Sequence, residues 1–129
     1  MPSNDKPFHE QPIGKMAVFL VPSLKLKKRP KSGLMIEERI HKFLLRKFGG
    51  YTAATGNIFG YWKDDSGREF YGEHKEYKVG LLEDNRIPEL KRFLAQMAAD
   101  LDEQCLYLEA GKEASFIYAR KRKVARREV

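Results

Sequence analysis

The sequence YTAATGNIFGYWKDDSGREFYGEHKEYKVGLL, residues 51–82, decides the fold of this chain. Aromatic and branched side chains dominate both halves of the stretch, and Asp64-Asp65-Ser66-Gly67 interrupts them with a turn sequence. Glycine tolerates the left-handed backbone conformation that such a turn needs. The stretch therefore predicts a long β-hairpin.

The second half of this hairpin alternates with a period of two, which places neighbouring side chains on opposite faces of a strand. Tyr71 and Glu73 share one face with Tyr77, Val79 and Leu81. Because the last three of these residues are apolar or aromatic, we expect this face to be buried at the C-terminal half of the strand.

Two amphipathic helices are predicted on either side of the hairpin in the sequence. In residues 35–48 apolar side chains recur at helical spacing, acidic residues come early and basic residues late, as the helix dipole favours, and Gly49-Gly50 ends the segment. Ile87-Pro88-Glu89 opens the second helix, because proline is tolerated in the first turn. An apolar stripe continues to Leu101, and we expect the helix to end near Asp102, with basic neighbours offsetting its acidic end.

Three further strands complete the pattern. Residues 15–21 (KMAVFLV) are apolar and rich in branched side chains, which predicts a short buried strand. Residues 105–110 (CLYLEA) and 113–119 (EASFIYA) flank Gly111-Lys112, which predicts a second hairpin with a glycine-first turn. The order β-α-β-β-α-β-β folds most simply as an α+β, ferredoxin-like sandwich, an antiparallel sheet of about five strands with two helices on one face.

The composition predicts one domain. A chain of 129 residues with 42% hydrophobic residues can bury one core but not two. We expect a flexible segment at 1–14, a single α+β domain at 15–119 and a basic C-terminal tail at 120–129. The single cysteine, Cys105, excludes an internal disulfide, and no apolar run approaches the roughly 20 residues that span a bilayer. The N-terminal segment lacks the apolar stretch of a signal peptide, so we expect a soluble, cytoplasmic protein.

The first hairpin resembles that of a small bacterial family of proteins of uncharacterised function. The residues that carry the resemblance are Gly50-Tyr51-Thr52, Gly60-Tyr61-Trp62, Gly67, Glu73 and Tyr77-Lys78-Val79-Gly80-Leu81. The similarity continues through residues 103–109 and Phe116-Ile117. Since that family has no assigned activity, the resemblance implies a fold rather than a function.

The charge distribution is the strongest indication of a partner. The net charge is +7, but segments 25–31 (KLKKRPK) and 120–129 (RKRKVARREV) carry +5 each, which leaves −3 for the rest of the chain. Clustered cations attract polyanions and release counterions when they reach phosphates. We therefore expect a small basic, non-enzymatic protein that docks on nucleic acid or a nucleoprotein complex. The residues expected to bind are Lys25, Lys27, Lys28, Arg29, Lys31, Arg120, Lys121, Arg122, Lys123, Arg126 and Arg127.

A single basic surface requires both basic clusters to leave the same end of the sheet. The first basic cluster, residues 25–31, follows the first strand, and the basic tail, residues 120–129, follows the last strand. Both leave the same end of the sheet only if these strands run parallel. Otherwise they are two separate solvated segments. Phosphate contacts without side chains that bind base edges predict a weak sequence preference.

A second hypothesis is a small enzyme or ligand-binding protein with a pocket at Trp62, Tyr71 and Glu73, between the sheet and the helices or at the seam of a homodimer. A carboxylate at Glu73, on an apolar strand face across the hairpin from Trp62, would be partly desolvated and would suit general acid or base catalysis. Alternatively, Glu73 is a surface or rim carboxylate paired with Lys75 or with a hydrogen-bonding tyrosine. A third hypothesis is an adaptor or inhibitor that binds another protein by strand addition at the sheet edge.

The sequence contains no catalytic or metal-binding signature. His9, His41 and His74 do not have the spacing of a ligand motif, and the lone cysteine adds none. Nothing in the sequence places a serine or cysteine nucleophile near a base. We therefore predict no metal, no cofactor and no membrane partner, and we favour a protein without enzymatic activity.

Overall fold

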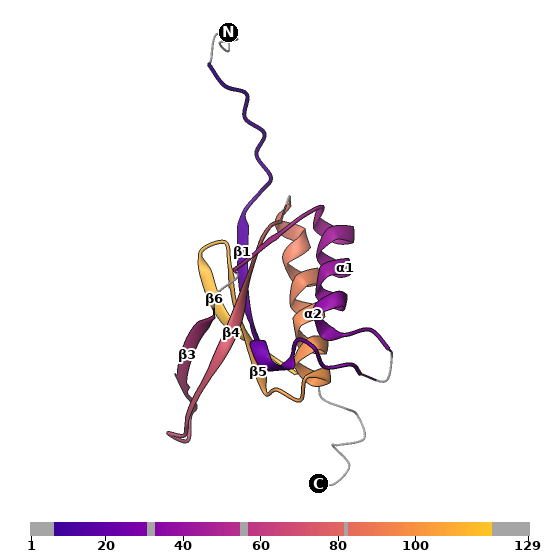
Figure 1. The fold of residues 1–129 in the computed structure, drawn as a ribbon. Helices are drawn as coiled ribbons and strands as arrows, with labels where there is room; N and C mark the ends of the chain where they lie inside the picture. The colour runs from indigo at the N-terminus through magenta and orange to yellow at the C-terminus, as the bar shows by residue number, and fades with distance from the viewer. Residues whose placement is uncertain (1–6, 31–32, 55–56, 82, 120–129) are drawn as a thin grey trace.

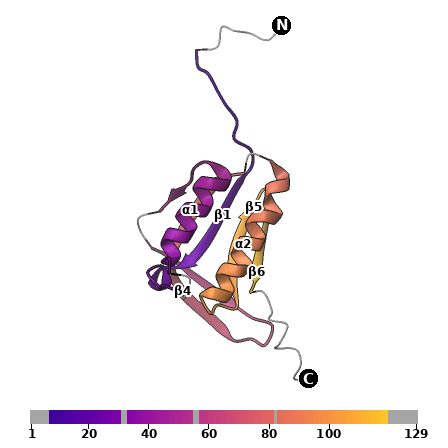
Figure 2. The ribbon, with the colours of Figure 1, turned by 90° about the vertical axis from the view of Figure 1, so that its right-hand side faces the viewer.

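The computed structural model describes residues 7–30, 33–54, 57–81 and 83–119. One six-stranded antiparallel sheet has both helices on one face, as Figures 1 and 2 show. The predicted ferredoxin-like α+β fold is confirmed. The elements are β1 (Met16–Pro22), a 3-10 turn η1 (Ser23–Lys25), α1 (Ile36–Phe48), β2 (Thr52–Ala53), β3 (Ile58–Lys63), β4 (Glu69–Gly80), a 3-10 turn η2 (Asp84–Arg86), α2 (Ile87–Asp100), β5 (Cys105–Ala110) and β6 (Glu113–Tyr118).

The strands follow the order β2-β4-β1-β5-β6, and β3 also pairs with β4. His74 in β4 has Ile58 of β3 as its partner on one side and Pro22 of β1 on the other. The strand β3 therefore lies at one edge of the sheet, and β6 lies at the opposite edge. Since β5 is antiparallel to both β1 and β6, β1 and β6 run in the same direction.

The face of the sheet toward the helices, the covered face, holds the core. Phe19 of β1 lies between its partners Tyr77 of β4 and Leu108 of β5, and all three side chains are at most 1% exposed. The rings of Phe19 and Tyr77 stack with centroids 5.2 Å apart. Burial of each such side chain contributes about 1.5–3 kcal/mol. The prediction that the C-terminal half of β4 is buried on this face is confirmed.

The helix ends follow the predicted signals closely. Gly49 ends α1 with φ 84°, a conformation that favours glycine. The helix α2 ends at Asp100, and its acidic end is offset by Arg39 of α1, whose Nη1 lies 2.7 Å from Asp100 Oδ2. Beyond it, Asp102 has the left-handed φ of 59°. No helix in the described ranges is long and apolar enough to cross a membrane.

The predicted turn of the first hairpin is confirmed. Asp64 Oδ1 accepts hydrogen bonds from the backbone N–H groups of Ser66, at 2.9 Å, and Arg68, at 3.0 Å. Gly67 takes φ 88°. The carboxylate thus replaces the ladder bonds that the chain loses where it reverses, and the two strands continue in register from Lys63 opposite Glu69.

Candidate functional site

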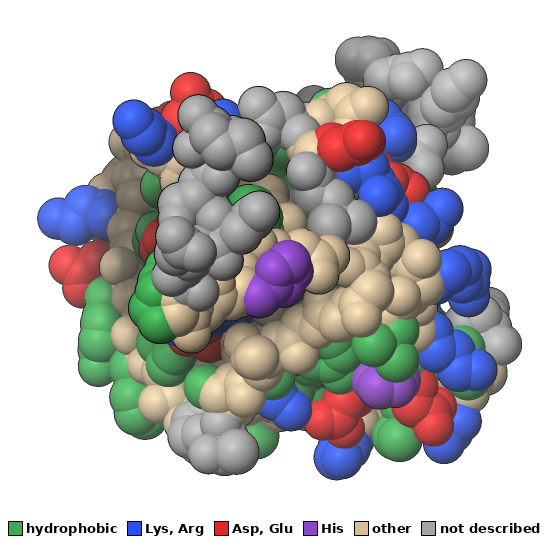
Figure 3. All heavy atoms as spheres, turned by 90° about the horizontal axis from the view of Figure 1, so that it is seen from above, with side chains coloured by type: hydrophobic (Ala, Val, Ile, Leu, Met, Phe, Trp, Pro, Cys, Tyr) green, Lys and Arg blue, Asp and Glu red, His purple; other side chains and the backbone are tan. Residues whose placement is uncertain are grey.

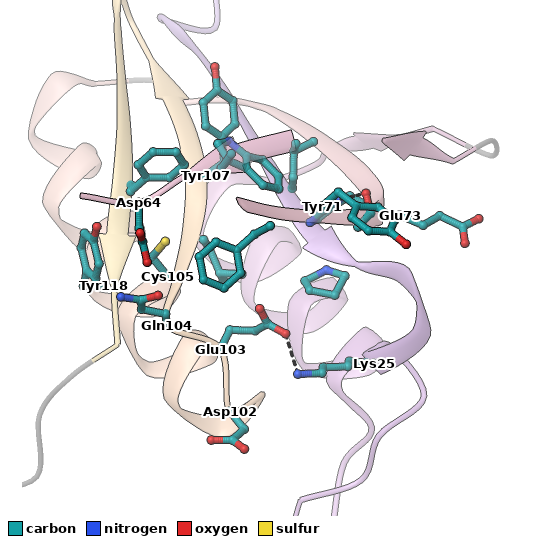
Figure 4. A pocket seen from close by; sticks show the side chains of 18 of the residues that line it. Lys25, Asp64, Tyr71, Glu73, Asp102, Glu103, Gln104, Cys105, Tyr107 and Tyr118 are labelled. Atoms are coloured by element: carbon teal, nitrogen blue, oxygen red, sulfur yellow. Dashed lines mark hydrogen bonds and ion pairs between the residues drawn. The ribbon is translucent and has the colours of Figure 1, made fainter. Parts of the chain in front are cut away.

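A pocket of about 480 Å³ lies on the other face of the sheet, the open face, which the helices do not cover. Leu20 alternates with buried Phe19 along β1, and Tyr107 alternates with buried Leu106 along β5, so these two lining side chains point away from the helices. In Figure 4, Cys105 and Tyr118 lie on one side of the pocket and Tyr71 and Glu73 of β4 on the other. Strands β1, β3, β4, β5 and β6 and the loop after α2 therefore build the site.

The sheet curls around this pocket. The ring centroids of Trp62 in β3 and Phe116 in β6 lie 6.1 Å apart, although these strands form opposite edges of the sheet. Four strand spacings of about 4.8 Å would place the edges of a flat sheet about 19 Å apart. Strand twist accumulates into curvature, and here it brings the two hairpins together over the open face. Aromatic rings from both hairpins therefore meet in one wall.

Two paired glycines make room for that wall. Gly60 lies opposite Gly72, and a Cβ built on Gly60 would come within 2.1 Å of the Trp62 ring. A Cβ on Gly72 would lie 3.2 Å from Cε1 of His74. The two rings contact each other edge to face with centroids 5.1 Å apart. The absence of side chains at both glycines thus allows the indole and the imidazole to lie against the strands.

His74 is held in a defined orientation. Its side chain is buried, and Nδ1 lies 2.9 Å from the carbonyl oxygen of Gly72. Because a carbonyl oxygen only accepts, Nδ1 carries a proton and donates it to this hydrogen bond. Sequence reasoning treated His74 only as one of three scattered histidines. Its position in β4 on the same face as Phe70, beside paired glycines, was the available signal.

The loop after α2 forms a polar end of the pocket, with Lys25, Asp102, Glu103 and Gln104. Lys25 Nζ donates to the carbonyl oxygen of Leu101 at 2.9 Å and to Glu103 Oε2 at 2.5 Å (Figure 4). Burial raises the pKa of the Cys105 thiol, and the negative charge of Glu103 raises it further. The thiol therefore stays protonated at neutral pH and is not an activated nucleophile.

The pocket is acidic although the chain is basic. Four acidic residues line it, Asp64, Glu73, Asp102 and Glu103, against the two basic residues Lys25 and Lys63. Apart from His74, the lining therefore has two more acidic than basic residues. A cationic ligand is therefore favoured electrostatically over an anionic one. Among the described residues, no group of three or more His, Cys, Asp and Glu side chains could hold a metal ion.

The residues predicted for a pocket, Trp62, Tyr71 and Glu73, all line this one. It lies on the open face, however, and not between the sheet and the helices. Trp62 pairs with Phe70, whereas Glu73 pairs with Phe59, so Trp62 and Glu73 point to opposite faces of the hairpin. Tyr71 is 77% exposed and stacks on Tyr61. Only Trp62 of the three is an inner wall residue, and the other two form the rim.

Most of the described cationic side chains of the first basic cluster contact acceptors of the same chain. Lys25 pairs with Glu103, Lys27 Nζ lies 2.8 Å from Glu37 Oε1, and Arg29 donates to the carbonyl oxygen of Gly33. Lys28 is exposed, whereas Lys31 and all predicted residues from 120 to 127 lie outside the described residues. The parallel direction of β1 and β6 meets the geometric condition for a common basic surface. Lys25, Lys27 and Arg29 nevertheless face acceptors of the same chain. Figure 3 shows the opposite end of the molecule, where basic and acidic side chains are interspersed.

Two solved structures share this fold. One is a phage SAM (S-adenosylmethionine) lyase in complex with S-methyl-5′-thioadenosine, at a TM-score of 0.57 and 12% identity, covering 92% of this chain and 100% of the other. The second is a phage SAM lyase in the apo state, at a TM-score of 0.53 and 14% identity, covering 85% of this chain and 93% of the other. At this identity the likeness concerns the fold. No protein-family model and no curated protein matches the chain.

These comparisons overturn the nucleic-acid hypothesis. The solved chains with this fold belong to an enzyme, one of them in complex with a small nucleoside. The acidic lining of the pocket and the internal pairing of Lys25 and Lys27 give the physical reason. The predictions of a nucleic-acid-binding function and of a nucleic-acid or nucleoprotein partner were wrong.

Proposed function

We propose that this protein is a small-ligand enzyme that binds S-adenosylmethionine in the open-face pocket and cleaves it to S-methyl-5′-thioadenosine. The observation that carries the proposal is the aromatic, acidic pocket of about 480 Å³ in a fold shared with a lyase of that substrate. Its volume lies within the roughly 300–1,000 Å³ of typical ligand sites.

The lining suits each part of such a ligand. An adenine ring stacks on aromatic side chains, which Trp62, Phe70 and Phe116 supply. A sulfonium cation is attracted to aromatic faces and to carboxylates, of which the pocket has a surplus. After cleavage the sulfur is neutral, so the product loses this attraction and is released more readily.

The chemistry needs no activated protein nucleophile, which agrees with the protonated thiol of Cys105. In the proposed step the bond between the sulfonium sulfur and the γ-carbon of the methionine part breaks, and its electron pair stays on sulfur. The carboxylate of the substrate forms the new bond to that carbon and closes a lactone. The protein holds the two reacting ends together and excludes water, which is how positioning lowers such a barrier.

The test is to incubate the full chain with S-adenosylmethionine and to measure S-methyl-5′-thioadenosine and the lactone by mass spectrometry, with nucleoside binding measured by calorimetry. We expect product formation, and we expect Trp62→Ala to weaken nucleoside binding roughly tenfold to a hundredfold, because one stacking contact is lost. Lys42→Ala, on the exposed side of α1, is the matched control and should match the wild type. Binding of S-adenosylmethionine without product formation would contradict the lyase step. If the protein binds neither S-adenosylmethionine nor S-methyl-5′-thioadenosine, the whole proposal is refuted.

A further inference from the structure

We propose that the ion pair of Lys25 and Glu103 binds the amino-acid end of the ligand and makes the pocket selective for adenosyl compounds that carry this group. In this arrangement the ligand carboxylate accepts from Lys25, and its α-ammonium donates to Glu103. The inference rests on the proposed function and specifies which end of the pocket receives which part of the substrate.

Hydrogen bonds within the chain hold the polar end in place. After α2, the N–H groups of Leu101 and Glu103 donate to the carbonyl oxygens of Met97 and Ala98, at 2.9 and 2.8 Å. Between them Asp102 has φ 59°, in the left-handed region that favours glycine. This reversal directs Glu103 toward Lys25, as Figure 4 shows. A strained turn beside a pocket is typical of a site that orients a ligand group.

The ion pair keeps bonding capacity for a ligand. An ammonium group has three N–H donors, and Lys25 uses two of them on the described residues, toward Leu101 and Glu103. Glu103 uses Oε2 for Lys25, which leaves Oε1 without a contact among those that the structure describes. The side chains are 34% and 29% exposed, so both remain accessible.

The charge pattern identifies the complementary group. A paired ammonium and carboxylate attract a second ammonium and carboxylate that lie in the reverse order, and hydrogen bonds between charged groups are the strong ones. The α-amino acid group of an adenosyl amino acid is such a pair. A nucleotide phosphate, in contrast, would meet the carboxylates of Asp102 and Glu103 beside the lone ammonium group of Lys25.

The experiment compares two ligands that the protein does not cleave. S-adenosylhomocysteine carries the amino-acid group on a neutral sulfur, and S-methyl-5′-thioadenosine lacks that group. We expect Lys25→Met and Glu103→Gln each to weaken binding of S-adenosylhomocysteine about tenfold to a hundredfold. Both variants should change binding of S-methyl-5′-thioadenosine less than about twofold, which also shows that they remain folded. Lys27→Met, in the same cluster but outside the pocket lining, is the matched control.

The outcomes separate this inference from the proposed function. If wild type binds S-methyl-5′-thioadenosine and the Lys25 and Glu103 variants weaken both ligands equally, or neither, the pair does not contact the amino-acid group. The proposed function then stands, and the inference is refuted. If wild type binds neither ligand, both fail.

Discussion

The two faces of this sheet differ in how completely their side chains are buried, although the same strands build both. On the covered face Phe19 and Leu108 are at most 1% exposed and contact the helices and neighbouring strands. On the open face Phe116 remains 41% exposed, and a charged pair ends the pocket. One face therefore stabilises the fold by burial, whereas the other leaves contacts that a ligand can complete.

The largest expected effect on stability comes from truncating a phenylalanine to alanine on the covered face, compared with the same truncation on the open face. Phe19→Ala should lower the free energy of unfolding by about 3–5 kcal/mol, because it opens a cavity in the core. Phe116→Ala should lower it by only about 1 kcal/mol, since its ring is partly solvated, but it should weaken nucleoside binding. Urea denaturation and calorimetry measure both quantities. Equal destabilisation by the two substitutions would contradict the distinction between the faces.

A smaller effect is expected at Gly60, where the Trp62 ring leaves no room for a side chain on the open face. Gly60→Ala places a methyl group on the Trp62 ring and should displace it, at about 1–3 kcal/mol of stability and with a marked loss of nucleoside binding. Gly72→Ala is the control, because its Cβ would stand 3.2 Å from His74 and needs only a small shift. The fluorescence spectrum of the single tryptophan reports the displacement. An unchanged spectrum and affinity in Gly60→Ala would show that the wall tolerates the added methyl group.

The smallest expected effect is a gain on the covered face. The buried hydroxyl of Tyr77 has no hydrogen-bond partner among the described residues, and burial raises the pKa of this group. Tyr77→Phe keeps the stacked ring and should stabilise the protein by about 1 kcal/mol, because it removes a polar group without a partner. Tyr51→Phe should instead destabilise it slightly, since that hydroxyl lies 2.8 Å from His41 Nδ1. Thermal unfolding of both variants tests the opposite signs, and a lower melting temperature for Tyr77→Phe would refute this account.

Most of the covered face was predictable from the sequence. The stripe of α1, the proline-opened start of α2 and the turn at Asp64 to Gly67 are local signals, and the structure confirms each of them. Alternation along β4 also indicated the buried side of Tyr77 and Val79. Such patterns are readable because helix and strand periods decide which side chains share a face.

The open-face site was predictable only in part. Trp62, Tyr71 and Glu73 were expected to line a pocket, and they do line this one, but Lys25, His74 and Glu103 were not expected there. Lys25 and Glu103 lie 78 positions apart, so no spacing rule could pair them. The same pairing is why the first basic cluster was misinterpreted: a count of charges along a segment does not include the carboxylates that fold against it.

The sequence by itself determined the element order, the helix ends and the buried half of β4, because these depend on neighbours within a few residues. Only the tertiary structure decided that the sheet curls until Trp62 and Phe116 meet, and that an acidic pocket forms in a chain of net charge +7. The curvature of the sheet and the charge of the pocket both combine contributions from strands that are far apart in the chain. These contributions come together only when the strands pair.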